Sequence, residues 1–110
     1  MDKTSLTELA EKNLTEARNA HSGRSAHTVH GGHASTLRQT LIALIAGQRL
    51  DEHENPGEAT LYVLTGRVRL TSGDDGQDAG AGDLLIIPDA RHALEALQDS
   101  VVLLTVAKLP

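Results

Sequence analysis

The sequence predicts a single domain in which a short helix precedes an all-β barrel or sandwich. The chain has 110 residues, which fits one domain of ordinary size. Apolar residues recur at helical spacing near the N-terminus. From residue 37 onward, short apolar runs alternate with turn residues at intervals of roughly 8 to 12 residues, the rhythm of a sandwich or a barrel. We therefore expect residues 1–23 to form a helix and linker, and residues 24–110 to form the β-domain.

The predicted helix lies within residues 4–20. Ser5 followed by Glu8 has the pattern of a capping box, which satisfies free backbone N–H groups at a helix start. Several residues recur at helical spacing and would lie mostly on one stripe of the helix: Leu6, Leu9, Ala10, Asn13, Leu14 and Ala17. We expect this stripe to pack against the β-domain.

Residues 21–36 break the helical periodicity, with Gly23, Gly31 and Gly32 among them, and we interpret them as a linker or a loose edge strand. The following segment, residues 37–47, is apolar on both faces, so a buried helix is the alternative to the strand that Gly47 favours. The remaining predicted strands are 58–66, 67–71, 84–88, 91–97 and 101–107, with a hairpin loop at 72–77 and a glycine corner at 79–83.

The core must be built from small aliphatic side chains. The chain has no Phe, no Trp and no Cys, and Tyr62 is its one aromatic residue. A domain of this size leaves roughly a third of its chain surface unburied, and a dimer interface would add burial. We therefore expect a homodimer, with residues 24–46 exchanged or paired across the two-fold axis.

Charge and composition exclude several classes of function. The formal net charge is −5 and the Lys and Arg residues are scattered, so the pattern of a nucleic-acid-binding surface is missing. No apolar run reaches the ~18 residues of a membrane span, and the polar N-terminus lacks the features of a secretion signal. The expectation is a cytoplasmic protein that binds neither nucleic acid nor membrane. Disulfides and thiolate zinc sites are excluded because there is no Cys.

Two spaced motifs carry a resemblance to a known family. In the first, Gly47 precedes His53 by six positions, Asn55 follows two positions later, and a strand ends at Gly66. In the second, Gly82 is followed by Pro88 and then by His92. Residues 37–107 thereby resemble the cupin superfamily, in the form of a small single-domain barrel. The resemblance implies a cupin-type jelly roll, or double-stranded β-helix barrel, with its ligand site at the barrel mouth.

The resemblance implies His53, Asn55 and His92 as ligand-binding residues of that mouth. Apolar side chains such as Leu61, Val63 and Leu94 would surround them. Metal-bearing cupins use a His, a second His two residues later, a Glu on the next strand and a His of the second motif. Here Asn55 replaces the second His, and Ala59 stands at the position of the Glu.

Glu58 lies one position from Ala59, and a shift of one residue in a strand sends the side chain to the opposite face unless a bulge intervenes. Two imidazoles and an amide oxygen form a weak chelate for a divalent transition ion. We therefore expect no cofactor, with a metal weakly held by His53 and His92 as the alternative. Glu58, His30 or His33 could complete a metal site, and the sequence leaves this open.

Three functions remain open at this stage. The first is a small-molecule-binding barrel whose ligand is small and polar or anionic. The second is an enzyme, either a metal-dependent isomerase or dioxygenase with altered ligands, or a metal-free one with His53 or His92 as general base. The third is a dimeric interaction protein whose barrel is filled by its own side chains.

Overall fold

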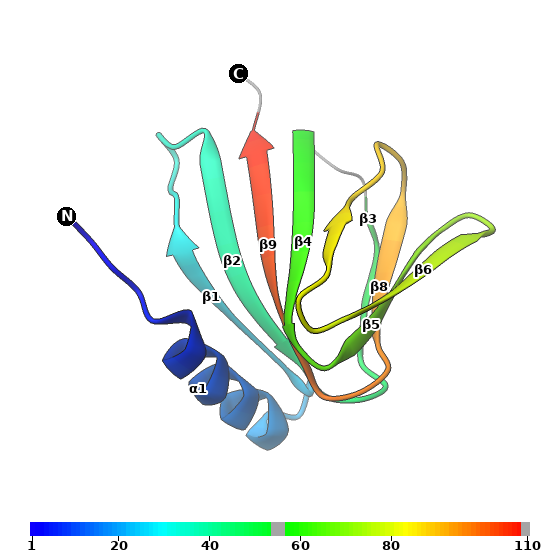
Figure 1. Cartoon of the computed structure of the whole chain (residues 1–110), viewed down its shortest axis with the longest axis horizontal. Helices are drawn as coiled ribbons and strands as arrows, with labels where there is room; N and C mark the ends of the chain where they lie inside the picture. The colour runs from blue at the N-terminus through cyan, green and yellow to red at the C-terminus, as the bar shows by residue number, and fades with distance from the viewer. Residues whose placement is uncertain (54–56, 109–110) are drawn as a thin grey trace.

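The computed structural model describes residues 1–53 and 57–108, without the side chains of Glu52 and His53. Helix α1 (Leu6–Asn19) is followed by strands that form two antiparallel sheets (Figure 1). The strands of the described residues are β1 (Arg24–His30), β2 (Leu37–Leu44), β3 (Arg49–His53), β4 (Gly57–Thr65), β5 (Arg67–Ser72), β6 (Asp75–Gly80), β7 (Leu84–Ile86), β8 (His92–Ala96) and β9 (Ser100–Lys108). The predicted all-β fold with a short N-terminal helix is confirmed.

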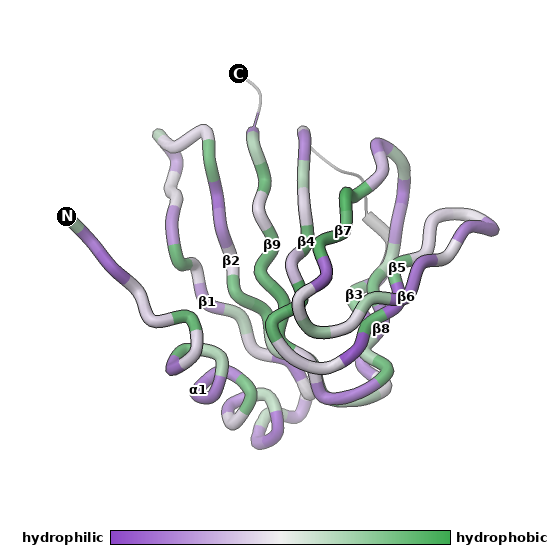
Figure 2. Tube along the Cα trace, viewed as in Figure 1, coloured by the Kyte–Doolittle hydropathy of each residue, from purple (hydrophilic) through white to green (hydrophobic). Residues whose placement is uncertain are grey.

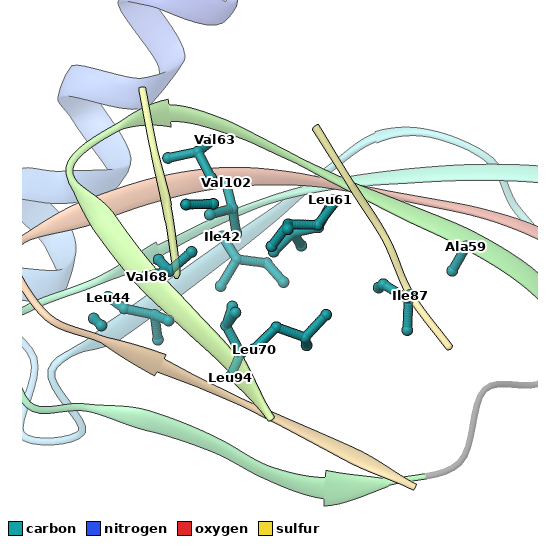
Figure 3. Packing of buried hydrophobic residues seen from close by; sticks show 13 residues of the cluster. Ile42, Leu44, Ala59, Leu61, Val63, Val68, Leu70, Ile87, Leu94 and Val102 are labelled. Carbon is teal, nitrogen blue, oxygen red and sulfur yellow. The ribbon is translucent and has the colours of Figure 1, made fainter. Parts of the chain in front are cut away.

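The sheets have the orders β1-β2-β9-β4-β7 and β3-β8-β5-β6. Their facing sides enclose an aliphatic core, in which Leu70 and Leu94 of one sheet approach Ile42 and Leu61 of the other (Figure 3). Burying one such side chain stabilises the fold by roughly 1.5 to 3 kcal/mol. The prediction of a core made from Leu, Val, Ile and Ala is confirmed.

Strand β4 shows the alternation that places side chains inside or outside the barrel. Ala59, Leu61 and Val63 are buried in the core, whereas Glu58 and Tyr62 are exposed on the outer face. This follows from the pleat of a strand, in which successive side chains point to opposite faces. The same rule assigns the inner face on the neighbouring strands.

The inner faces change character along the barrel axis. After Leu37, strand β2 runs from a hydrophilic stretch into a hydrophobic one (Figure 2). Strand β8 begins at His92, and β9 runs antiparallel to β2. We call the end of the barrel that contains the starts of β2, β4 and β8 the His92 end. The opposite end is closed by buried aliphatic side chains such as Leu44 and Val68.

Helix α1 covers part of the outer face of the five-stranded sheet, as predicted. Ser5 is its N-cap, and the side-chain oxygen of Ser5 accepts a hydrogen bond from the Glu8 N–H at 3.3 Å. Ala10 and Ala17 are buried against that face, and the Asn13 amide donates to the Leu41 carbonyl at 3.4 Å. The helix therefore occupies the side of the sheet that faces away from the barrel interior.

Two segments differ from the sequence prediction. The polar run Asp75–Gly80 forms strand β6, although the pattern had assigned it to a hairpin loop and a glycine corner. Backbone hydrogen bonds with β5 hold this segment as a strand. The sequence prediction looked for apolar alternation, which this polar segment lacks. Residues 24–30 form the edge strand β1, which resolves the choice between linker and edge strand.

Candidate functional site

His92 is the buried polar side chain at the start of β8, and 4% of its surface is exposed. It shares the inner face of that strand with Leu94 and Ala96, which belong to the core. The His92 Nδ1 atom lies 2.9 Å from the carbonyl oxygen of Ala90, so Nδ1–H donates to that oxygen. The imidazole is thereby oriented by the chain segment just before it.

The other two residues of the predicted mouth are only partly placed. The backbone of His53 pairs with that of His92 across strands β3 and β8. The His53 side chain lies outside the described part of the structure, as does Asn55. The predicted grouping of His53, Asn55 and His92 therefore stays a prediction, with the backbones of the two histidines brought together as neighbours.

Glu58 and Ala59 decide what β4 contributes to the mouth. Ala59 is 7% exposed and belongs to the core, whereas Glu58 is exposed on the outer face. The pairing of β4 with β9 runs without a shift from Gly57 to Val63, so no bulge turns Glu58 inward. The inward position at this level consequently carries a methyl group, which cannot coordinate a metal.

The residues that the structure describes do not gather a metal-binding set. Among them, no group of three or more His, Asp or Glu side chains is placed to hold an ion. His92 supplies an imidazole, and Ala59 supplies no donor atom. The described residues alone therefore do not fit a transition-metal centre, which needs three or four ligands from the protein.

Arg38 of β2 is a second polar side chain on the inner face, and the sequence prediction missed it. Arg38 lies on the same face of β2 as Ile42 and Leu44, which are part of the core. Its cross-strand partner is Val106, whose partner on the other side is Ala59. Arg38 is therefore at the His92 end of the barrel, in the same row as the position where metal-bearing cupins have their Glu.

The contacts of the Arg38 guanidinium are incomplete within the described part of the chain. Its Nε atom is buried and has no hydrogen-bond partner there. One terminal nitrogen donates to the Gly32 carbonyl at 3.4 Å, and that carbonyl also accepts the Ser35 N–H at 3.1 Å. A buried donor without an acceptor costs roughly 1 to 3 kcal/mol. A native protein that tolerates such a cost often does so at a functional position.

Comparison with known families decides which fold family this arrangement represents. The model of the family described as "Cupin domain" matches residues 40–107. The chain belongs to the cupin family. The predicted cupin membership and barrel type are thereby confirmed.

Solved structures with this cupin fold come from several bacteria. An RmlC-like cupin protein from Desulfovibrio desulfuricans is 24% identical, with 97% of this chain and 96% of that chain covered and a TM-score of 0.73. A conserved protein of unknown function from Streptococcus pyogenes is 25% identical, with 83% and 79% covered and a TM-score of 0.74.

An enzyme shares the same barrel. A point mutant of salicylate 1,2-dioxygenase from Pseudoaminobacter salicylatoxidans is 18% identical, with a TM-score of 0.76. Its match covers 91% of this chain and 33% of that chain. At this identity the likeness shows the fold alone.

No functionally curated protein is similar enough in sequence to match. The cupin fold supports a small-molecule-binding role for this chain, and its ligand is a matter for proposal.

A cleft of about 930 Å³ opens between strands β6 and β7, the edge strands of the two sheets on one side of the barrel. Core residues Leu70 and Leu85 form its floor, and Ala90, whose carbonyl accepts from His92, lies on its wall.

The rim of this cleft is acidic, and its charges are partly compensated. Arg69 pairs with Asp78 at 2.7 Å, and this hydrogen bond lowers the pKa of the Asp78 carboxyl and raises the pKa of Arg69. The Asp83 carboxylate accepts the Gly80 N–H at 2.9 Å. These bonds stabilise the β5–β6 hairpin and the turn after it, so we assign them a structural role.

The histidine tract before β2 lies on an exposed edge. His27 and His30 belong to β1, and His33 follows it, and all of them are exposed. β1 is the outermost strand of the five-stranded sheet, whereas β8 belongs to the other sheet. Among the described residues these side chains join no metal-binding group. Over the same part of the chain, helix α1 is too short and too polar to cross a membrane.

Proposed function

We propose that this cupin binds a small polar or anionic molecule at the His92 end of its barrel. One observation carries the proposal: the buried imidazole of His92 is oriented by Ala90, and the other inward side chains of β8, Leu94 and Ala96, are aliphatic. Small-molecule sites are concave and mostly apolar, with a few polar groups that fix the orientation of the ligand. His92 supplies one such polar group beside the aliphatic core.

The chemistry of His92 suits a polar ligand. With Nδ1–H donating to Ala90, the neutral ring presents Nε2 as a hydrogen-bond acceptor, and the protonated ring donates from both nitrogens. An imidazole can therefore bind either a hydroxyl or an anionic oxygen. The same group could act as a general base in an enzyme, and identification of a ligand would be the first step towards testing that role.

We propose further that binding is metal-poor or metal-free. Ala59 faces the core at the position where metal-bearing cupins have a Glu, and Glu58 faces outward. An ion held by His53, Asn55 and His92 would lack a carboxylate to balance its charge. Elemental analysis of protein purified without chelator or metal-affinity resin tests this: near-stoichiometric Fe, Mn, Zn or Ni would favour the metal-dependent enzyme instead.

A ligand screen tests the binding site itself. Small polar molecules would be added to isotopically labelled protein, and amide resonances at the start of β8 would be followed by NMR. We expect hits that shift these resonances in the wild type and lose affinity in the His92→Ala variant. His27→Ala is the matched control, because His27 is exposed on β1. A screen in which hits bind both variants equally would contradict the assignment of His92.

We propose a homodimer as the assembled form, as the small core suggests. Exposed apolar side chains support this proposal: Leu84 is 58% exposed and Ile86 is 71% exposed on β7. Leu84 and Ile86 lie two positions apart on one face of this edge strand, and contiguous exposed apolar surface is typical of interaction sites. Sedimentation velocity over a range of protein concentrations distinguishes a dimer from a monomer.

A further inference from the structure

We infer that Arg38 is the anion-binding residue of the barrel and that the ligand carries a carboxylate group. The inference rests on the proposed function, because it assigns a ligand class to the same site. It starts from the guanidinium of Arg38, whose Nε is buried without a hydrogen-bond partner among the described residues. A buried charged donor without a partner calls for an explanation in a native protein, and a bound anion is one that its charge favours.

The charges of the described side chains leave Arg38 uncompensated. Arg18 pairs with Asp99 and Arg69 pairs with Asp78, and neither of these ion pairs includes Arg38. The hydrogen bond from Arg38 to Gly32 is long and shares its acceptor with Ser35. The guanidinium therefore keeps donors that no described group of the protein satisfies.

The geometry of a guanidinium selects for a carboxylate. Nε–H and the neighbouring terminal N–H point in parallel from one edge of the planar group, and this edge matches the two oxygens of a carboxylate. A neutral amide or alcohol offers one acceptor atom to that edge and brings no charge. Arg38 should consequently distinguish carboxylates from neutral molecules of the same shape.

The absence of a Glu at position 59 makes this role available to Arg38. Arg38 and Ala59 share a row of the inner face, with Val106 between them. Neighbouring strands lie about 4.8 Å apart, and Arg38 and Ala59 are separated by two such spacings. An inward Glu in place of Ala59 would come within reach of the long Arg38 side chain and would compete with a ligand for it. With Ala59, the cation has no such competitor and attracts the anionic end of a ligand.

His92 completes the site from the opposite sheet. Arg38 and His92 lie at the same end of the barrel, on inner faces of sheets that pack about 10 Å apart. A small molecule that enters the barrel from this end would meet both side chains. Arg38 would hold the carboxylate, and the imidazole of His92 would bind a second polar group of the same molecule.

The loop beside Arg38 fixes its position. Gly31 has φ +112°, and a Cβ there would lie 2.7 Å from the Leu37 carbonyl oxygen and 2.9 Å from Cγ of Arg38. Glycine therefore lets the loop backbone approach the aliphatic stem of Arg38 closely. The stem is confined, which reduces the entropy that the guanidinium loses when it binds a ligand.

Matched pairs of carboxylates and amides test this inference. Benzoate with benzamide and succinate with succinamide would be titrated into protein labelled with 15N-arginine, and the Nε–H resonance of Arg38 would be followed. We expect the carboxylates to shift this resonance and the amides to leave it in place. The Arg38→Gln variant should bind carboxylates about 10-fold to 100-fold more weakly, as expected for loss of a charged hydrogen bond.

Control variants distinguish the role of Arg38 in binding from effects of misfolding and of a changed net charge. Arg67→Gln removes the same charge from an exposed position on β5 and should bind like the wild type. Arg38→Lys keeps the charge but not the two-pronged edge, and it should bind carboxylates with intermediate affinity. If Arg38→Gln does not fold, the Nε–H titration of the wild type and the Arg38→Lys variant decide the question.

The outcomes distinguish the two proposals. Carboxylates and amides that bind the wild type equally well, or carboxylate binding that Arg38→Gln leaves unchanged, would overturn the role of Arg38 while the barrel remains a binding site. Binding of neither class, with no shift of the resonances at the start of β8, would count against the proposed function and remove the basis of this inference.

Discussion

The Nδ1 atom of His92 lies 2.9 Å from the carbonyl oxygen of Ala90, two positions earlier in the chain. A carbonyl oxygen only accepts hydrogen bonds, so Nδ1 carries a proton and, in the neutral ring, Nε2 carries the lone pair. The turn before β8 therefore selects one tautomer of this buried imidazole. The same turn holds the His92 ring at the start of β8.

The first prediction is that neutral His92 adopts the Nδ1–H tautomer. Long-range 1H–15N correlation spectra of histidine-labelled protein distinguish the two ring nitrogens, at a pH high enough to keep the ring neutral. The His92→Gln variant lacks the corresponding signals and so assigns them. A neutral ring with its proton on Nε2 would contradict the orientation on which the proposed ligand contact depends.

The second prediction concerns the bend between β4 and β5. Gly66 has φ +87°, and a Cβ at this position would overlap the Asp99 carbonyl oxygen and the Ser100 hydroxyl. We expect Gly66→Ala to lower the free energy of unfolding by about 3 kcal/mol or more, since it combines left-handed strain with overpacking. Urea denaturation monitored by circular dichroism measures the change.

Gly73 provides the control for this substitution. Its φ is +57°, but a Cβ there would meet no heavy atom of the described residues within 4 Å. Gly73→Ala should therefore cost about 1 kcal/mol, from backbone strain alone. Equal losses in the two variants would mean that the close approach of Gly66 to Asp99 and Ser100, at the start of β9, contributes nothing to the cost.

Part of this arrangement could be predicted from the sequence. The two-residue period of a strand is sufficient to place Ala59 inside and Glu58 outside, once Gly66 has marked the end of β4. The spacing of glycine, proline and histidine was sufficient to suggest the cupin barrel. Both inferences depend on local geometry, which short sequence patterns record well.

The rest required the pairing of distant strands. Arg38 stands in a run that is apolar on both faces, so its inward orientation follows only from the ladder between β2 and β9. Strand β6 is polar and rich in glycine, and its strand conformation depends on the hydrogen bonds with β5. Such long-range pairings override local propensity, which is why the sequence pattern alone missed them.

The third prediction uses the carboxylate of Asp99. Its pKa is lowered mainly by the hydrogen bond from the Ala46 N–H at 2.9 Å, and also by Arg18. A lowered pKa in the folded state stabilises the protein above the unfolded pKa of about 3.9, and the contribution is lost as the pH falls through the folded value. Asp99→Asn should therefore cost about 1 kcal/mol or less near neutral pH, since the group is partly exposed.

The pH dependence is the decisive part of that experiment. Urea denaturation from pH 7 to pH 3 should show a constant difference between the wild type and Asp99→Asn at the upper end. The difference should shrink below about pH 4, where the carboxyl group becomes protonated first in the unfolded chain and then, at lower pH, in the folded protein. Asp74→Asn, in the exposed turn between β5 and β6, is the control and should change stability little at any pH. A difference in the free energy of unfolding that grows as the pH falls would contradict the predicted direction of the pH dependence.

The fourth prediction restores a carboxylate inside the barrel. Ala59 faces the core beside Val106, so Ala59→Glu places an acidic group at the level where metal-bearing cupins have one. Without metal the variant should be destabilised by a few kcal/mol, because a buried carboxyl group lacks a partner. Mn²⁺ or Zn²⁺ should raise its melting temperature more than that of the wild type, since binding to the folded state stabilises it.

Glu58→Gln, on the outer face, should leave the response to metal unchanged. A wild type that already responds as strongly as Ala59→Glu would show that other residues complete a metal site.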